Sequence, residues 1–306
     1  MSWRIHINDR TIHKLQIISK DNERILLVWY QNAIGCYDVE KGVLYDTRRP
    51  ISSPEPSAGE EWETYLDSLR APNGLPLPYV RTKNALLYLT MDGNQTVVDD
   101  GFGLQVLAKK TLHHFSQIDT EMLTMSVDYK SGIIAVLGEN THLYLYRETT
   151  LLGEYALPIP LKQGILPDVF MSEHAQQVFI CDGNHLLVYN RAGALRIHHT
   201  FSYTVGKIAC SPNGEMLIAS DAHNGVLRVY VGGQQFRFSY QKFAVDLYAK
   251  ARQLQLLVSA PTPLTAVNGL TIEDDGTFAF SMGGVVVMTH IDYMDEIPSP
   301  LGLIYT

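Results

Sequence analysis

One stretch of the sequence, residues 207–231, constrains the fold more than any other feature. It alternates short apolar runs with tight polar turns. The first turn, residues 211–214 (SPNG), combines a proline that pre-sets the backbone with a glycine that can adopt a left-handed conformation. A second polar turn, residues 221–225, separates two further apolar runs. This order predicts one unit of a repeated antiparallel sheet.

The same pattern recurs along the whole chain at intervals of about 40 residues. Repeats of four short strands at this spacing are typical of the blades of a β-propeller. We therefore predict an all-β fold, a β-propeller of four-stranded blades, with residues 1–306 forming a single domain. The aligned first turns number seven, so seven blades are favoured over six; they lie at Glu23, Asn84, Gly132, Ala175, Gly214, Gln253 and Gly276.

The N-terminal residues 3–7 also read as a strand, because apolar and polar side chains alternate there. No partner strand follows closely in the sequence. A radial array of sheets must protect its first and last edges. We therefore expect this strand to complete the last blade.

Residues 50–78 break the repeat with an insertion that is rich in proline and acidic residues. Ser57 followed by Glu60 has the spacing of a helix capping box. Four large apolar residues then fall on one face of a helix, which predicts one helical insertion after the first blade. These are Trp62, Tyr65, Leu66 and Leu69.

The unit at residues 211–230 resembles a WD-repeat. The resemblance lies in the SPNG turn, the LIAS run at 217–220, Asp221, Gly225 and the VLRVY run at 226–230. It implies a WD-repeat-like β-propeller that binds other proteins. The repeats are degenerate, since they have neither the Trp-Asp pair nor the Gly-His pair, and tyrosines stand near the tryptophan position; these are Tyr37, Tyr146, Tyr189 and Tyr230.

Composition narrows the classes of partner. The formal net charge of −8 disfavours nucleic acid, whose phosphates require clustered Lys and Arg. The three cysteines lack metal-ligand spacing and fit reduced core residues. There is no signal-peptide pattern and no apolar run of the roughly 18 residues that a membrane span requires. We expect a cytoplasmic protein that is monomeric by itself and has no cofactor.

Two sets of residues suggest metal binding. The doublets His113-His114 and His198-His199 occur near the ends of comparable units, but neighbouring residues of a strand point to opposite faces. Carboxylates beside the predicted inner strands are a second set, because acids from several blades can hold a cation. Such a site would consist of Asp128, Asp168, Asp246 and Glu273, with Arg81 and Lys207 nearby.

Two functions remain open. The first is a non-catalytic scaffold that binds partner proteins through loops and the insertion. Its contacts would come from Trp62, Tyr65, Leu66 and Leu69 and from the acidic Glu61, Glu63 and Asp67, unless the apolar four pack on the propeller itself. Loops 158–167 and 260–269 would extend this surface. The alternative is a metal-assisted hydrolase or lactonase with its site at the mouth of the central channel.

Overall fold

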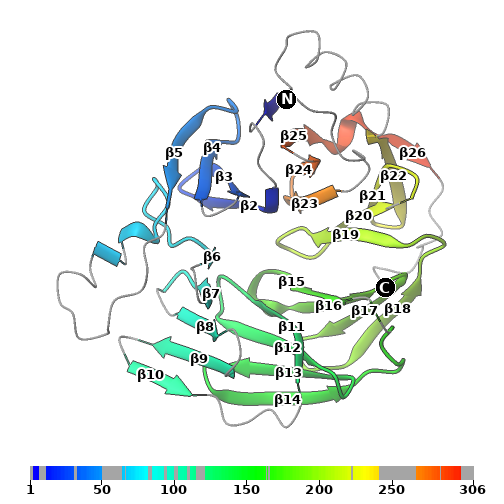
Figure 1. Cartoon of the computed structure of the whole chain (residues 1–306). Coiled ribbons are helices and arrows are strands. Elements are labelled where there is room, and N and C mark those ends of the chain that lie inside the picture. Colours follow the sequence, from blue (N-terminus) through cyan, green and yellow to red (C-terminus); the bar gives the residue numbers. More distant parts are fainter. Residues whose placement is uncertain are drawn as a thin grey trace. The chain divides into compact units, whose positions relative to one another are not determined.

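A computed structural model gives the arrangement of the chain, and Figure 1 shows its strands in order. The structure describes residues 3–6, 12–30, 33–49, 64–65, 67–81, 85–92, 95–99, 103–108, 111–114, 121–162, 164, 166–221, 223–240, 267–282 and 284–297. By contacts between its residues the chain divides into two compact units. Unit 1 holds residues 1–31, 35–45 and 199–306, and unit 2 holds residues 32–34 and 46–198.

Three sheets lie wholly or mostly in unit 1. We name them the first (β2-β3-β4-β5), the fifth (β19-β20-β21-β22-β26) and the sixth sheet (β1-β25-β24-β23). Within the unit, β23 lies against both β2 and β19. The strands are β1 (Trp3–His6), β2 (Ile12–Lys20), β3 (Glu23–Tyr30), β4 (Ala33–Asp38), β5 (Leu44–Arg48), β19 (Val205–Cys210), β20 (Met216–Asp221), β21 (Val226–Val231), β22 (Gln234–Ser239), β23 (Val267–Ile272), β24 (Thr277–Met282), β25 (Val285–His290) and β26 (Asp295–Ile297), with the 3₁₀ turn η2 (Ile291–Tyr293).

Unit 2 holds the second (β10-β9-β8-β7-β6), third (β11-β12-β13-β14) and fourth sheet (β15-β16-β17-β18). Strands β11 and β15 lie side by side within it. The strands are β6 (Tyr79–Arg81), β7 (Ala85–Leu89), β8 (Gln95–Asp99), β9 (Gly103–Ala108), β10 (Thr111–His114), β11 (Met122–Val127), β12 (Ile133–Gly138), β13 (His142–Arg147), β14 (Thr150–Ala156), β15 (Asp168–Met171), β16 (Gln177–Asp182), β17 (His185–Asn190) and β18 (Leu195–Thr200), with the 3₁₀ turn η1 (Glu173–Ala175).

The turn between the first two strands is built alike in several sheets. In the fifth sheet the Gly214 N–H donates to the Ser211 carbonyl at 2.9 Å, and Gly214 has a φ of 77°. In the fourth sheet the Ala175 N–H donates to the Ser172 carbonyl at 3.0 Å, and Ala175 has a φ of 49°. The sequence alignment of Ala175 with Gly214 is therefore confirmed, and the alanine holds a left-handed conformation that glycine adopts without cost.

The N-terminal strand pairs as the sequence predicts. Strand β1 runs antiparallel to β25, with Trp3 opposite Met288 and His6 opposite Val285 (Figure 1). It supplies the fourth strand of the sixth sheet, which has only three strands of its own. The edge of β25 is thus covered by residues from the other end of the chain.

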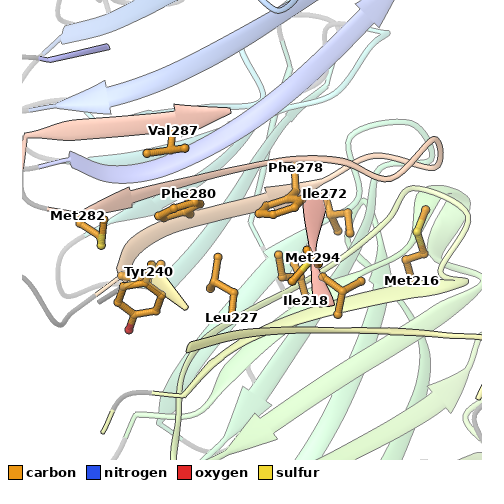
Figure 2. Close-up of a cluster of buried hydrophobic side chains, with 12 residues drawn as sticks. Met216, Ile218, Leu227, Tyr240, Ile272, Phe278, Phe280, Met282, Val287 and Met294 are labelled. Carbon is orange, nitrogen blue, oxygen red and sulfur yellow. The ribbon is translucent and has the colours of Figure 1, made fainter. Parts of the chain in front are cut away.

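A core of aromatic, methionine and aliphatic side chains joins the fifth and sixth sheets. Figure 2 shows Phe278 and Phe280 of β24 facing Ile218 and Leu227 of the fifth sheet. Phe280 also lies 6.1 Å from Tyr240, measured between ring centroids. Burial of a large apolar side chain contributes roughly 1.5–3 kcal/mol. This packing explains why the alternate residues Phe278, Phe280 and Met282, which share one face of β24, are large and apolar.

The predicted number of seven blades is wrong, since the described residues form six sheets. The count of seven required a hairpin near residue 253 in addition to the one at Gly276, only 23 residues later. A four-stranded blade needs about 40 residues. The sixth sheet needs fewer residues because its fourth strand is β1, from the N-terminal end of the chain. The predicted hairpin near residue 253 lies in residues 241–266, outside the described part.

Two sheets also depart from four strands. The second sheet has five because residues 95–99 form an additional strand, β8. The fifth sheet gains β26, which runs antiparallel to β22 with Glu296 opposite Phe236. The sequence gives no signal for this pairing, since the two strands are separated by the whole sixth blade.

The predicted helical insertion is also wrong for the part that the structure describes. Residues 64–65 and 67–68 are helical, and the chain turns back at 70–74. The Ala71 N–H donates to the Leu75 carbonyl at 2.8 Å, and the Leu77 N–H donates to the Leu69 carbonyl at 2.7 Å. These groups pair across a loop instead of along a helix. Residues 50–63 lie outside the described part.

Candidate functional site

The apolar face predicted for the insertion divides between buried and undescribed residues. Tyr65 and Leu69 are fully buried, with relative exposures of 0% and 1%. The acidic Asp67 is exposed. The remaining predicted contact residues lie outside the part of the insertion that the structure describes; these are Glu61, Trp62 and Glu63, together with the side chain of Leu66.

A neighbouring turn holds the insertion in place. The Tyr129 hydroxyl donates to the Pro76 carbonyl at 2.6 Å. The guanidinium of Arg70 donates to the Gly74 carbonyl at 2.9 Å, which closes the loop after the helical turn. The hydrogen bond from Tyr129 thus ties the end of the insertion to the turn that follows β11, and the one from Arg70 closes the loop on itself.

The predicted carboxylates take separate places. Asp128 follows the last residue of β11, and its carboxylate accepts hydrogen bonds from the Ser131 N–H at 2.9 Å and from the Ser131 hydroxyl. Asp168 is the first residue of β15, opposite Cys181. Glu273 follows the end of β23, and its N–H donates to the Thr277 carbonyl. Asp246 lies outside the described residues.

The histidine doublets do not form a cluster either. His113 and His114 lie on β10, opposite Val106 and Gln105. His198, on β18, has its ring 5.8 Å from that of His185 on β17. Over the ranges that the structure describes, no group of three or more His, Cys, Asp or Glu side chains has the geometry for a metal ion.

Loop 158–167, which the sequence assigns to a partner surface, is tied to the fourth sheet. The Lys162 N–H donates to Asp182 Oδ2 at 2.7 Å, and its ammonium donates to Asn184 Oδ1 at 2.5 Å. Asp182 ends β16, and Asn184 stands in the hairpin turn that follows. Of loop 260–269, only residues 267–269 are described, as the start of β23.

Apolar side chains are exposed on the outermost strand of the third sheet. Leu151 and Leu152 of β14 have relative exposures of 46% and 47%. A β-bulge lies here, because Tyr146 pairs with Leu151 while Leu145 pairs with Gly153. Bulges of edge strands re-aim side chains and discourage unspecific pairing. This pair of leucines was missed at the sequence level, since the repeat pattern does not show which apolar runs are outermost.

A polar cluster that the sequence does not predict lies in the fifth sheet. Asp221, fully buried, accepts hydrogen bonds from Asn224 Nδ2 at 2.9 Å and from Arg228 Nη2 at 3.4 Å. The guanidinium of Arg228 lies 4.8 Å from the ring centre of Tyr203, whose hydroxyl is 2.8 Å from that of Tyr230. Burial would raise the pKa of Asp221, but these hydrogen bonds lower it below its usual value.

Two lysines, Lys14 and Lys207, stand near the starts of β2 and β19. Lys14 is half-buried beside Trp29, with Nζ 5.9 Å from the centre of its ring. Burial, together with the charge of Lys207, lowers the pKa of Lys14 to about 8. Lys207 was noted in the sequence as an inner-strand residue, whereas nothing in the sequence singled out Lys14.

Two of the three cysteines are buried thiols. Cys36 and Cys181 are buried, and burial raises the pKa of Cys181 to about 12. A thiol of such high pKa carries little thiolate at neutral pH. No helix of the described residues is long and apolar enough to cross a membrane.

Comparison with known proteins identifies the fold and not a family. No protein-family model and no curated protein matches the sequence. Among solved structures, the chain is similar to the β-propeller domain of Cps50 (Swd1) from Myceliophteria thermophila. The TM-score is 0.60 at 9% identity, over 93% of this chain and 97% of that one.

A second similar structure is Raptor from Chaetomium thermophilum. The TM-score is 0.53 at 9% identity, over 95% of this chain but only 24% of Raptor. At these identities the likeness concerns the fold alone. Together with the six antiparallel sheets, it shows that this chain has an all-β, β-propeller fold.

Proposed function

We propose that the protein is a non-catalytic interaction scaffold, a WD-like propeller that binds one or more partner proteins. The observation that carries this proposal is the pair of exposed leucines, Leu151 and Leu152, on the outermost strand of the third sheet. Two adjacent apolar side chains held in water cost free energy that a bound partner would recover.

A comparison of the outer strands β22 and β14 supports β14 as the binding surface. In the fifth sheet the outer edge of β22 pairs with β26 of the same chain. In the third sheet, β14 is the last strand in the order of the described residues. An unpaired edge offers backbone N–H and carbonyl groups to an added strand. A partner segment that pairs with β14 would cover both leucines.

The insertion supplies a second part of the proposed surface. Its polar side, with Glu61, Glu63 and the exposed Asp67, would contact basic groups of a partner. Tyr65 and Leu69 are buried and serve to hold the segment, and Trp62 and Leu66 belong to the same predicted apolar face. The net charge of −8 favours partners with basic surfaces.

The proposal also covers the domain organisation, oligomeric state, location and partner class of the protein. We propose that residues 1–306 form one domain, monomeric by itself, in the cytoplasm. Proteins are its partners, and neither nucleic acid nor a membrane is among them. The negative charge supports the exclusion of nucleic acid.

Crosslinking followed by affinity recovery from the native cells tests the proposal. The wild type should recover specific partners, and Leu151→Glu/Leu152→Glu should lose them while keeping its melting temperature, because both positions are exposed. Val43→Glu is the matched control, since Val43 is 56% exposed but lies before β5 in the first sheet. Equal recovery by the wild type and the double variant would overturn this surface.

The hydrolase alternative receives no support from the described carboxylates. Asp128 is engaged in its own turn, and Asp168 begins its strand whereas Asp128 follows the end of its strand. Measurement of bound divalent metal in protein purified without chelators distinguishes the two functions.

A further inference from the structure

Strand β26 is an addition to a sheet that is complete without it. Strands β19 to β22 already give the fifth sheet the four strands of a propeller blade. Residues 295–297 run antiparallel to β22 on its outer edge, although they follow β25 of the sixth sheet in the chain (Figure 1). The outer edge of β25 is not open to them, because β1 pairs there. The chain itself thus shows that the outer edge of β22 accepts an added strand.

The backbone of β22 presents alternate residues to this edge. Just after β22, the Tyr240 N–H donates to the Gly225 carbonyl at 3.0 Å, so these two residues form a hydrogen-bonded pair. Hydrogen-bonded and non-hydrogen-bonded pairs alternate along an antiparallel ladder. The N–H and carbonyl groups of Gln235, Arg237 and Ser239 therefore point away from β21. Strand β26 lies opposite only two of these three residues, Gln235 and Arg237.

The strand that now covers this edge is short. Strand β26 has three residues, whereas β22 has six. Two prolines, Pro298 and Pro300, follow β26 in the sequence, and proline has no N–H to donate to a ladder. Because each hydrogen bond contributes little net free energy in water, three residues hold such a strand weakly. A longer extended segment would form more of these bonds and would displace β26.

The chain just before β26 is anchored separately. Met294 is 8% exposed and packs into the core between the fifth and sixth sheets (Figure 2). Its N–H donates to the Ile291 carbonyl at 2.9 Å, and the Ile291 N–H donates to the Gly276 carbonyl at 3.0 Å. All of these contacts precede residue 295. Strand β26 can therefore leave β22 while the core stays closed.

Charges along one row of the fifth sheet favour an acidic occupant. Arg237 of β22 stands directly opposite Arg228 of β21, and like charges in opposite positions destabilise a sheet. Arg228 donates to Asp221 Oδ2 at 3.4 Å, whereas Arg237 is exposed on the outer side of the sheet. The residue of β26 at the register position opposite Arg237 is Asp295. An added strand is therefore favoured when it carries an acidic residue at this position.

We propose that the outer edge of β22 is a second docking site, for an extended segment of a partner protein. The segment carries an acidic residue opposite Arg237 and an aliphatic residue opposite Gln235, where β26 has Ile297. Main-chain hydrogen bonds supply the affinity of such strand addition, and side-chain positions supply its specificity. In the isolated chain β26 covers the edge and prevents unspecific pairing. The inference rests on the proposed scaffold function but concerns a sheet other than that of Leu151 and Leu152.

A labelled peptide tests the site on the full chain. The probe carries the sequence of residues 293–297, YMDEI, followed by Thr-Val in place of the prolines, so that it can pair with the whole of β22. Fluorescence anisotropy measures its binding. The wild type should bind the probe weakly, because the tethered β26 competes at a high effective concentration.

Ile297→Pro releases the internal strand, because it removes an N–H that points toward β22. Glu296→Pro is the matched control, since residue 296 forms a non-hydrogen-bonded pair with Phe236 and its N–H points away. The Ile297→Pro variant should bind the probe about fivefold more tightly than the wild type or the control, the change expected when β26 loses one net hydrogen bond. Thermal unfolding verifies that both variants are folded.

Charge reversal tests the preference for an acidic segment. In the Ile297→Pro background, Arg237→Glu should weaken binding of the probe about fivefold and should favour a second probe with Lys in place of its Asp. Arg196→Glu is the control, because Arg196 is exposed on the outermost strand of the fourth sheet, and it should change neither affinity. Leu151→Glu/Leu152→Glu should also leave both affinities unchanged, which separates this site from the β14 surface.

Two results would overturn the proposal. One is absence of probe binding by the Ile297→Pro variant, and the other is equal binding of the two probes with and without Arg237→Glu. Light scattering examines a second copy of this chain as the occupant. A dimer of the Ile297→Pro variant that Arg237→Glu dissociates would assign the edge to that copy, and the assignment to a partner protein would be wrong.

Discussion

The fourth and fifth sheets carry an aspartate and a tyrosine at the same positions, but the hydrogen bonds of these side chains differ between the two sheets. Asp182 and Asp221 each end the second strand, and both are buried. Tyr189 and Tyr230 each stand fifth in the third strand. The fifth sheet adds Arg228, and at the matching position the fourth sheet has a leucine.

The two aspartates have different hydrogen-bond partners. In the fifth sheet, Asp221 accepts from Asn224 and Arg228, both in or after its own turn. In the fourth sheet, Asp182 accepts from the N–H of Lys162 in loop 158–167, and its second oxygen has no partner among the described residues. A buried carboxylate must be hydrogen-bonded. In the fifth sheet the hydrogen bonds to the aspartate come from residues close in sequence, whereas in the fourth sheet the bond comes from Lys162, in a loop 20 residues earlier.

The largest effect is expected for Asp221→Ala. The substitution leaves the guanidinium of Arg228, with 20% side-chain exposure, without its carboxylate partner. Removing one member of a buried ion pair costs about 3–5 kcal/mol. Chemical denaturation monitored by fluorescence should show this loss in the free energy of unfolding.

The double variant Asp221→Asn/Arg228→Leu is the control for that prediction. It gives the fifth sheet the apolar residue of the fourth sheet, and replacing both members of a buried pair is often close to neutral. The double variant should therefore be clearly more stable than Asp221→Ala. If the two lose equal stability, Arg228 is not the group that Asp221 neutralises.

The contribution of the Asp221–Arg228 pair to stability should also depend on pH in the acid range. The folded-state pKa of Asp221 lies below its unfolded value because hydrogen bonds from Asn224, His223 and Arg228 outweigh the effect of burial. Its contribution is therefore present above the unfolded pKa of about 3.9 and is lost as the pH falls through the lower folded value. Asp221→Asn should flatten the stability profile below pH of about 4. An unchanged acid profile would contradict the lowered pKa.

Much of the fold was predictable from local signals. The SPNG turn and its relatives fix where each first hairpin lies, and the orphan N-terminal strand implies a distant partner, which β25 provides. The number of blades was not predictable in this way. The number of blades depends on whether the short last unit is completed by a strand from elsewhere in the chain. Local periodicity does not show pairing between strands that are far apart in the sequence.

The candidate sites were harder to predict for the same reason. The periodicity of Tyr65 and Leu69 correctly marks them as one apolar set, and both are buried. Lys14 and Arg228 look like ordinary strand residues in the sequence. Their surroundings form only on folding, when Lys14 comes to lie over the ring of Trp29 and Arg228 over the ring of Tyr203.

A smaller effect is expected for Asp182→Ala in the fourth sheet. The variant loses the hydrogen bond from the Lys162 N–H but leaves no buried cation behind. A hydrogen bond to a charged group is worth about 1.5–3 kcal/mol, and removal of the buried oxygen without a partner offsets part of it. Loop 158–167 should also become sensitive to trypsin at Lys162. Equal proteolysis of the variant and the wild type would show that other contacts hold the loop.

The smallest effects on stability are expected when the hydroxyl of Tyr230 or of Tyr189 is removed. The hydroxyl of Tyr230 shares a hydrogen bond of 2.8 Å with Tyr203, and burial raises the pKa of Tyr230 to about 12. Tyr230→Phe should therefore cost about 0.5–1.5 kcal/mol. The hydroxyl of Tyr189 is buried with no partner among the described residues, so Tyr189→Phe should be neutral or slightly stabilising. Both substitutions keep the ring and its packing, which makes the melting temperatures directly comparable. If Tyr189→Phe proves as costly as Tyr230→Phe, the fourth sheet holds a polar partner for Tyr189, and the proposed difference between the two sheets reduces to Arg228 alone.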